Sequence, residues 1–173
     1  MSISLEWLPP IASVDGEFAK VIAGLYNIFH RDFLENKPKL DSMDVWYDRE
    51  VKPGETYEEG FWHLITRDFA QDDSRTFDPK RAERLPWCSP VINHFKHVAV
   101  KYWTCKEKSE HVCYIWLEGH DYVVIFEKKT LKAKVVNGVE LKERKIAFLK
   151  TAYYLDGKSK RRSLSKKYER RIA

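Results

Sequence analysis

The fold of this chain is decided by the stretch Val112-Cys113-Tyr114-Ile115-Trp116-Leu117, Glu118-Gly119-His120-Asp121 and Tyr122-Val123-Val124-Ile125-Phe126. Two runs of β-branched and aromatic residues flank a short polar turn, which is the pattern of a β-hairpin. A similar run, Val98 to Trp103, precedes this hairpin across the polar turn Lys106 to Glu110. Lys132 to Val136 and Ile146 to Leu155 continue the meander. The second half of the chain is therefore expected to form an antiparallel sheet.

The first half of the chain has a helical period. Large apolar residues recur at spacings of three and four from Val14 to Phe33, which predicts an amphipathic helix with Asp15 as its cap. The remaining elements expected here are a strand or extended arm at Met43–Tyr47, a strand at Phe61–Thr66, a loop at Gln71–Phe77, a short helix at Pro79–Arg84 and a helix from Ser89-Pro90 to about His97. Helices followed by strands predict an α+β fold, in which N-terminal helices pack on one face of a curved antiparallel sheet.

Length and composition limit the class of protein. The 173 residues suit one domain, and a hydrophobic content of 43% excludes a disordered protein. No apolar run approaches 18 residues and the N-terminus lacks a signal peptide, so no membrane partner is expected. The three cysteines, Cys88, Cys105 and Cys113, cannot all pair, and reduced thiols indicate a cytoplasmic protein.

The basic residues are unevenly distributed. Residues 158–173 contain eight lysines and arginines and one glutamate, so this segment carries +7 while the rest of the chain carries −2. We expect a single α+β domain over residues 1–157, followed by a basic C-terminal tail over residues 158–173. The tail is interpreted as an electrostatic arm for a polyanion such as nucleic acid, with Lys160, Arg161 and Arg162 as contacts. The alternative is a solubilising, partly helical terminus.

One histidine lies in an apolar, aromatic run, Phe61-Trp62-His63-Leu64-Ile65-Thr66-Arg67-Asp68. By default, a histidine in such a strand-like run is a satisfied core or cross-strand residue. The functional alternative is proton transfer near pH 7, because neutral imidazole accepts a proton and imidazolium can return it.

Arginines and a late strand offer further groups for such chemistry. Arg67, Arg75, Arg81 and Arg84 either form a solvated face with acidic neighbours or include one or two side chains that bind phosphate in a cleft. In the segment Phe148-Leu149-Lys150-Thr151-Ala152-Tyr153-Tyr154, strand alternation places Leu149, Thr151 and Tyr153 on one face and Lys150 on the other. Threonine and tyrosine also favour strands for purely structural reasons.

The order of these motifs resembles that of a known group of RNases. The motifs are Phe61-Trp62-His63-Leu64-Ile65-Thr66, Arg81-x-x-Arg84-x-Pro86-Trp87, Tyr114-Ile115-Trp116-Leu117 with Tyr122-Val123-Val124-Ile125, and Lys150-Thr151-Ala152-Tyr153. Over roughly Tyr26 to Leu155, the chain is similar to the barnase, EndoU, colicin and RelE group of small bacterial and phage RNases and nuclease-like domains. The resemblance implies helices on an antiparallel sheet, with an active site built from an early histidine, basic residues and a Ser, Thr, His or Tyr on a late strand.

The resemblance also implies an activity. It is that of a metal-independent endoribonuclease without a cofactor, acting as a toxin or a phage-defence or prophage effector, with RNA and a protein antitoxin or inhibitor as partners. The 2′-hydroxyl attacks the adjacent phosphate in such a reaction, which requires a base, an acid and cations. The expected catalytic residues are His63, Thr151, Tyr153 and Arg84, and the expected RNA- or phosphate-binding residues are Arg67, Arg75, Arg81, Lys150, Lys160, Arg161 and Arg162. No second histidine matches the EndoU pair and the lysine-rich set of RelE is missing, so the acid–base partner of His63 is unassigned.

Two other interpretations stay open. The same scaffold suits a non-catalytic nucleic-acid-binding or phage accessory domain, in which Trp103, Tyr114 and Trp116 stack on bases. A zinc site is conceivable because six possible ligands fall within 26 positions: Cys88, His94, His97, Cys105, His111 and Cys113. Their spacings match no zinc knuckle, so no metal site is expected.

Overall fold

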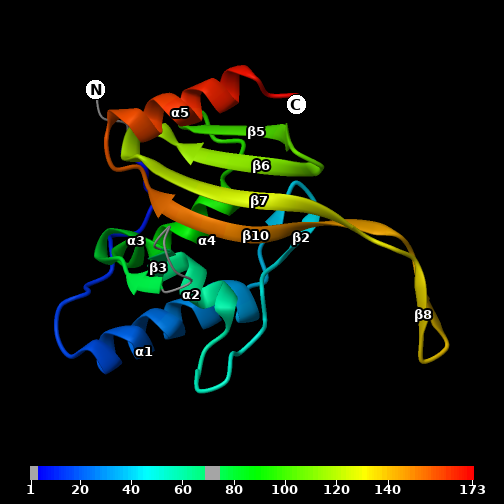
Figure 1. Cartoon of the computed structure of the whole chain (residues 1–173), viewed down its shortest axis with the longest axis horizontal. Helices are drawn as coiled ribbons and strands as arrows, with labels where there is room; N and C mark the ends of the chain where they lie inside the picture. The colour runs from blue at the N-terminus through cyan, green and yellow to red at the C-terminus, as the bar shows by residue number, and fades with distance from the viewer. Residues whose placement is uncertain (1–3, 69–74) are drawn as a thin grey trace.

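A curled six-stranded sheet with helices on both faces makes up the body of the protein (Figure 1). The structure is a computed structural model, and it describes residues 4–68 and 75–173. The strand order across the sheet is β1 (Lys39–Leu40), β2 (Met43–Trp46), β10 (Arg144–Tyr154), β7 (Tyr122–Leu131), β6 (Glu110–Leu117) and β5 (Val100–Glu107). All neighbouring strands are antiparallel except β2 and β10, which run parallel. The α+β prediction and the antiparallel meander of β5, β6, β7 and β10 are therefore confirmed. The predicted continuation of the meander at Lys132–Val136 is wrong, because residues 134–136 pair with residues 139–141 in a separate two-stranded sheet.

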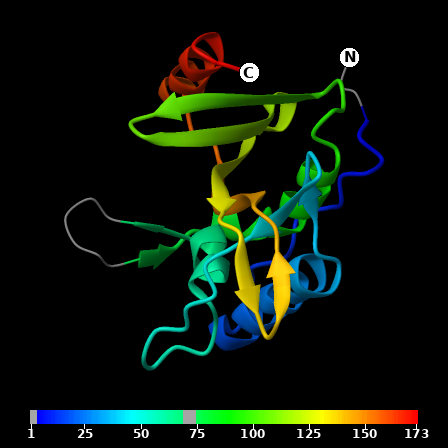
Figure 2. The ribbon, with the colours of Figure 1, turned by 90° about the vertical axis from the view of Figure 1, so that its right-hand side faces the viewer.

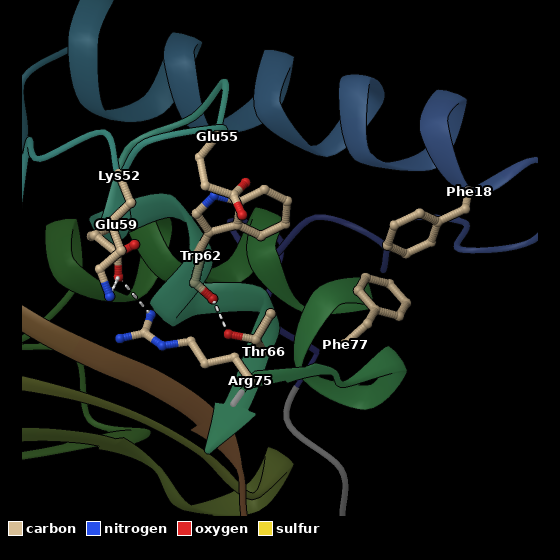
Figure 3. A pocket seen from close by; sticks show the side chains of 8 residues that line it. All are labelled: Phe18, Lys52, Glu55, Glu59, Trp62, Thr66, Arg75 and Phe77. Atoms are coloured by element: carbon tan, nitrogen blue, oxygen red, sulfur yellow. Dashed lines mark hydrogen bonds and ion pairs between the residues drawn. The ribbon is translucent and has the colours of Figure 1, made fainter. Parts of the chain in front are cut away.

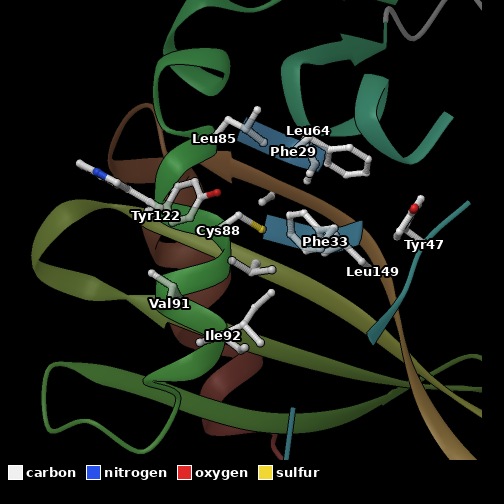
Figure 4. Packing of buried hydrophobic residues seen from close by; sticks show 14 of the residues in the cluster. Phe29, Phe33, Tyr47, Leu64, Leu85, Cys88, Val91, Ile92, Tyr122 and Leu149 are labelled. Atoms are coloured by element: carbon white, nitrogen blue, oxygen red, sulfur yellow. The ribbon is translucent and has the colours of Figure 1, made fainter. Parts of the chain in front are cut away.

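Four α-helices cover one face of the sheet: α1 (Phe18–Phe29), which continues as the π-helix η1 (His30–Glu35), α2 (Glu59–Ile65), α3 (Pro79–Glu83) and α4 (Leu85–Asn93). Alternate residues of β6 and β7, such as Ile115 and Val124, face these helices and are fully buried. Figure 4 shows Cys88, Val91 and Ile92 of α4 packed in this core. Successive side chains of a strand point to opposite faces, so every second residue of β6 and β7 points to the helices and contributes to the main hydrophobic core.

The opposite face is covered by the basic C-terminal segment, which folds as helix α5 (Lys158–Glu169; Figures 1 and 2). Leu164 of α5 is buried in a second cluster with Trp103, Tyr114 and Trp116, and Tyr168 packs against that cluster. Backbone hydrogen bonds then join the end of the chain to the edge strand β5: Thr104 donates to Ala173, and Ile172 donates to Thr104. The segment is therefore a docked helix that belongs to the folded body, rather than a free electrostatic arm. None of the helices in residues 4–68 and 75–173 is both long and apolar enough to cross a lipid bilayer.

The predicted strand at Phe61–Thr66 is wrong, because these residues belong to helix α2 and its C-cap. Phe61, Leu64 and Ile65 are buried at spacings of three and four, so the run is the apolar face of a short helix. Strand structure begins only at β3 (Thr66–Asp68), which pairs with β4 (Arg75–Phe77). The predicted loop at Gln71–Phe77 is wrong at β4, and its part up to Ser74 lies outside the described residues.

Two predicted helix starts also differ from the structure. The first helix begins at Phe18 with Glu17 as the N-cap residue, and Asp15 caps nothing there. Helix α4 begins at Leu85, so Ser89 and Pro90 lie inside it rather than at its start. Proline is tolerated in the first turn of a helix because that turn needs no amide donor, and Pro86 occupies that position in α4.

Strands β7 and β10 extend beyond the sheet into a hairpin made by β8 (Lys134–Val136) and β9 (Val139–Leu141; Figures 1 and 2). The two-residue turn is Asn137-Gly138, and both residues have positive φ, 51° and 78°. An Asn-Gly pair with two positive φ values is the preferred turn for a tight hairpin, because its twist matches that of the strands.

Candidate functional site

Helix α2 lies against the free edge of β10. Strand β2 pairs with β10 only from Ile146 to Phe148, and within residues 4–68 and 75–173 no strand pairs with the following residues of β10 on that side. The register with β7 shifts between Leu149 and Thr151, so Lys150 is an extra residue in a β-bulge. The bulge leaves Leu149 and Ala152 in the main core, whereas Thr151 and Tyr153 line a pocket beside α2. Simple alternation predicted that Leu149 and Thr151 share one face of the strand. This prediction is wrong, because the bulge turns them to different faces.

The pocket has a volume of about 350 Å³ and is lined by His63, Thr66, Asp68, Arg75, Arg81, Lys150, Thr151 and Tyr153. We call it the basic pocket, since three cationic side chains and His63 face a single carboxylate there. Six of the residues expected from the sequence meet in it: His63, Arg75, Arg81, Lys150, Thr151 and Tyr153. They come from α2, β4, α3 and β10, so the tertiary fold assembles this group.

His63 lies in the basic pocket with its imidazole Nε2 in contact with the Arg75 guanidinium. Burial and the neighbouring Arg75 cation lower the pKa of His63 below 6.5, while the Glu59 carboxylate and a hydrogen bond with the Lys150 backbone partly offset that shift. The imidazole is consequently neutral at pH 7. Because a guanidinium can only donate, Nε2 accepts from Arg75 and the ring proton is on Nδ1.

Glu59 is a site residue that sequence reasoning missed, as are Thr66 and Asp68 in the lining of the basic pocket. Glu59 is 5% exposed, and its carboxylate lies 3.2 Å from Arg75, 3.6 Å from His63 and 3.6 Å from Lys52. Glu59 and His63 are four residues apart, which makes them neighbours on a helix but leaves them about 13 Å apart on a strand. Because a strand was predicted here, there was no reason from the sequence to place Glu59 beside His63.

A second pocket of about 400 Å³ also has Arg75 in its wall (Figure 3). Arg75 and Thr66 line both pockets. The aromatic rings of Trp62, Phe18 and Phe77 form part of its wall, together with Glu59 and other polar side chains. Arg75 thus borders a basic pocket and an aromatic one, where it is held by ion pairs with Glu59 and with Asp68, the latter at 3.2 Å.

Arg81 fixes a positive charge in the wall of the basic pocket. Its Nη1 donates to the carbonyl of Thr66 at 2.5 Å, to the carbonyl of His63 at 3.2 Å and to Thr151 Oγ1 at 3.4 Å, and the guanidinium lies 5.4 Å from the centre of the Tyr153 ring. The carbonyls of His63 and Thr66 lie at the C-terminal end of α2, so the Arg81 cation stabilises the negative end of the helix dipole. Among the ion pairs of the described residues, none joins Arg81 to a carboxylate, and burial lowers its pKa.

The other expected residues lie elsewhere. Arg84 is outside the basic pocket, 4.2 Å from the centre of the Tyr154 ring and 2.7 Å from Glu83. Arg67 is exposed on β3. Lys160, Arg161 and Arg162 are on α5, which covers the other face of the sheet, and Arg161 forms an ion pair with Asp121.

The six possible zinc ligands do not come together. All three cysteines are buried and unpaired, with Cys113 in the main core and Cys105 in the cluster under α5. His94 stacks on Trp7 with ring centres 4.3 Å apart. Within residues 4–68 and 75–173, no three His, Cys, Asp or Glu side chains form a group that could hold a metal ion.

No protein-family model, curated protein or solved structure matches the chain. The similarity to the barnase, EndoU, colicin and RelE group therefore stays a prediction, and the chemistry of the site is argued from its geometry.

Proposed function

We propose that the protein is an endoribonuclease that cleaves RNA without a metal ion, by attack of a 2′-hydroxyl on the adjacent phosphate. The observation that supports this proposal is the basic pocket, where a neutral imidazole, three cationic side chains and the hydroxyls of Thr151 and Tyr153 line one cavity. A phosphodiester carries one negative charge, and more charge builds up on its oxygens in the transition state. Fixed cations and hydrogen-bond donors in a partly buried site stabilise that charge.

In the proposed reaction, Arg75, Arg81 and Lys150 hold the phosphate. Arg75 turns from His63 towards the phosphate when RNA binds, which frees Nε2 to accept the proton of the 2′-hydroxyl. The 2′-oxygen then bonds to phosphorus and the bond to the 5′-oxygen breaks, which leaves a 2′,3′-cyclic phosphate. The imidazolium that forms is stabilised by the carboxylate of Glu59, which is 3.6 Å away.

Tyr153 and Thr151 have different roles in this proposal. Burial raises the pKa of Tyr153, so its phenol stays protonated until it gives its proton to the departing 5′-oxygen. The phenolate then takes a proton from solvent while the His63 imidazolium releases one, which restores both groups. The Thr151 hydroxyl donates to the His63 carbonyl at 3.2 Å and accepts from Arg81, so Thr151 is a positioning residue that holds β10 against α2. Following the similarity of motifs, the proposal includes a role as a toxin or prophage effector that a protein antitoxin inhibits.

The experiment is RNA cleavage by purified wild-type protein and by His63→Asn in the presence of EDTA. Loss of a general base costs roughly 10²- to 10⁴-fold in rate, so cleavage by His63→Asn should be almost absent. His111→Asn is the matched control, because His111 is exposed on β6 and should keep wild-type activity. Product ends analysed by mass spectrometry should carry a 2′,3′-cyclic phosphate.

Equal cleavage by wild type and His63→Asn would refute the proposed mechanism, as would activity that EDTA abolishes. RNA binding without any cleavage by the wild-type protein would support the non-catalytic alternative.

A further inference from the structure

A two-stranded arm projects from the sheet beyond the ends of the other strands (Figures 1 and 2). We define the basic arm as residues 128–145, which include the ends of β7 and β10 and the β8–β9 hairpin. Every residue from Lys132 to Lys145 is exposed. An isolated two-stranded hairpin is only marginally stable in water, so an arm of this kind is expected to have a binding partner.

The arm is strongly cationic. It contains seven lysines and arginines and only two glutamates, so it carries +5, which equals the formal charge of the whole chain. Two of these cations form ion pairs: Lys129 with Glu127 at 3.9 Å, and Arg144 with Asp44 at 3.7 Å. Among the ion pairs of the described part of the chain, none involves Lys132, Lys134, Lys142 or Lys145. The charge is thus available for an anionic partner.

The tip of the arm is apolar. Val136 pairs with Val139 and Lys134 pairs with Leu141, so these four side chains share one face of the hairpin. Val136, Val139 and Leu141 are 42%, 59% and 44% exposed. Small aliphatic side chains at the tip and lysines along the stem suit a partner that has a charged rim and a less polar floor.

We propose that the basic arm binds the double-helical part of an RNA, a proposal that rests on the proposed function for the choice of RNA. The anionic backbone of a duplex complements the arm's lysines, and the wide, shallow minor groove of an RNA helix can accept a two-stranded ribbon with an aliphatic tip. Single-stranded RNA is bound mainly by stacking of bases on aromatic rings, and residues 128–145 contain no aromatic residue. The charge and composition of the arm therefore favour a duplex.

Strand β10 connects the arm to the basic pocket. Lys145 lies at the base of the arm and Thr151 at the pocket, and six residues of strand separate them by about 20 Å. An RNA stem on the arm would place its unpaired flank near His63. The substrate expected from this arrangement is a stem joined to a single-stranded segment.

The test measures binding of full-length protein to a 20-base-pair RNA duplex, a single-stranded RNA of equal length and a DNA duplex, by fluorescence anisotropy at several salt concentrations. All proteins carry His63→Asn so that RNA is not cleaved. The arm variant replaces three exposed lysines with glutamine: Lys132→Gln, Lys134→Gln and Lys142→Gln. The matched control removes three exposed lysines outside the arm: Lys20→Gln, Lys96→Gln and Lys106→Gln.

We expect the arm variant to bind the RNA duplex about tenfold more weakly, and the slope of log K against log salt to become shallower by about 2.7, because each lost phosphate contact contributes about 0.9. The control should change both quantities much less. Equal effects of the two variants, tighter binding of single-stranded RNA, or equal affinity for the DNA duplex would overturn the proposal. This assay measures binding alone, whereas the proposed function is tested by cleavage. A failure of the arm proposal and a failure of the proposed catalytic function can therefore be told apart.

Discussion

The pKa of His63 provides a direct test of the site geometry, because Glu59 and Arg75 shift it in opposite directions. Glu59→Gln removes a negative charge 3.6 Å from Nε2. At that distance the interaction is about 1 kcal/mol at the dielectric constant of water and about 5 kcal/mol at an effective value of 20. The His63 side chain is 29% exposed, so screening favours the lower limit. One pKa unit corresponds to about 1.4 kcal/mol, so the pKa of His63 should fall by about one unit in Glu59→Gln.

Arg75→Gln should have the opposite effect and raise the pKa of His63, because the guanidinium disfavours the protonated ring. The assay is an NMR titration of the imidazole signals, with the His63 signal assigned by its loss in His63→Asn. A pKa of His63 that rises in Glu59→Gln, or that is unchanged in both variants, would refute the arrangement of these three side chains.

Three further predictions concern stability, measured by urea denaturation. Arg81→Met removes the donor to the last carbonyls of α2 and should lower the free energy of unfolding by about 3 kcal/mol. A decrease in this free energy no larger than that caused by the exposed Arg162→Met would show that Arg81 does not stabilise the end of α2. Leu164→Ala should lower the free energy of unfolding by about 2–5 kcal/mol because it leaves a cavity under α5. A urea midpoint equal to that of the adjacent Ser163→Ala would show that α5 is not docked. The lowered pKa of His63 means that the unfolded chain binds the imidazole proton more readily than the folded chain does. The contribution of His63 to the free energy of unfolding should therefore be fully present above pH 6.5 and be lost as the pH falls from 6.5 to the folded pKa. The same dependence of this free energy on pH in His63→Asn would exclude His63 as its cause.

The sheet could be predicted from the sequence because its signal is local. In β6, Cys113, Ile115 and Leu117 face one core, and Tyr114 and Trp116 face the other. Both faces are buried, so the segment is an apolar run of strand length bounded by polar turns, and neighbouring runs of the same kind pair in order. The spacing from Val14 to Phe33 indicated a helix for a similarly local reason, although its first residues are not helical.

Helix α2 and helix α5 show where local signals fail. A short apolar run such as Phe61–Thr66 fits either a strand or a helix, and only its packing against β10 decides between them. In α5, the large apolar residues Leu164 and Tyr168 are four positions apart, but the surrounding charges dominate the composition. The burial of these two side chains against Trp103 nevertheless docks the helix on the sheet.

The sequence by itself determined the α+β class and most members of the basic pocket, because residue type and strand period are properties of short segments. Only the tertiary structure decided that His63 lies beside Thr151, 88 positions away, and that Glu59 joins them while Arg84 does not. Such contacts depend on how α2 packs against the free edge of β10, where a bulge sets the direction of the side chains. That packing minimises the free energy of the whole core, and no short segment contains the information that specifies it.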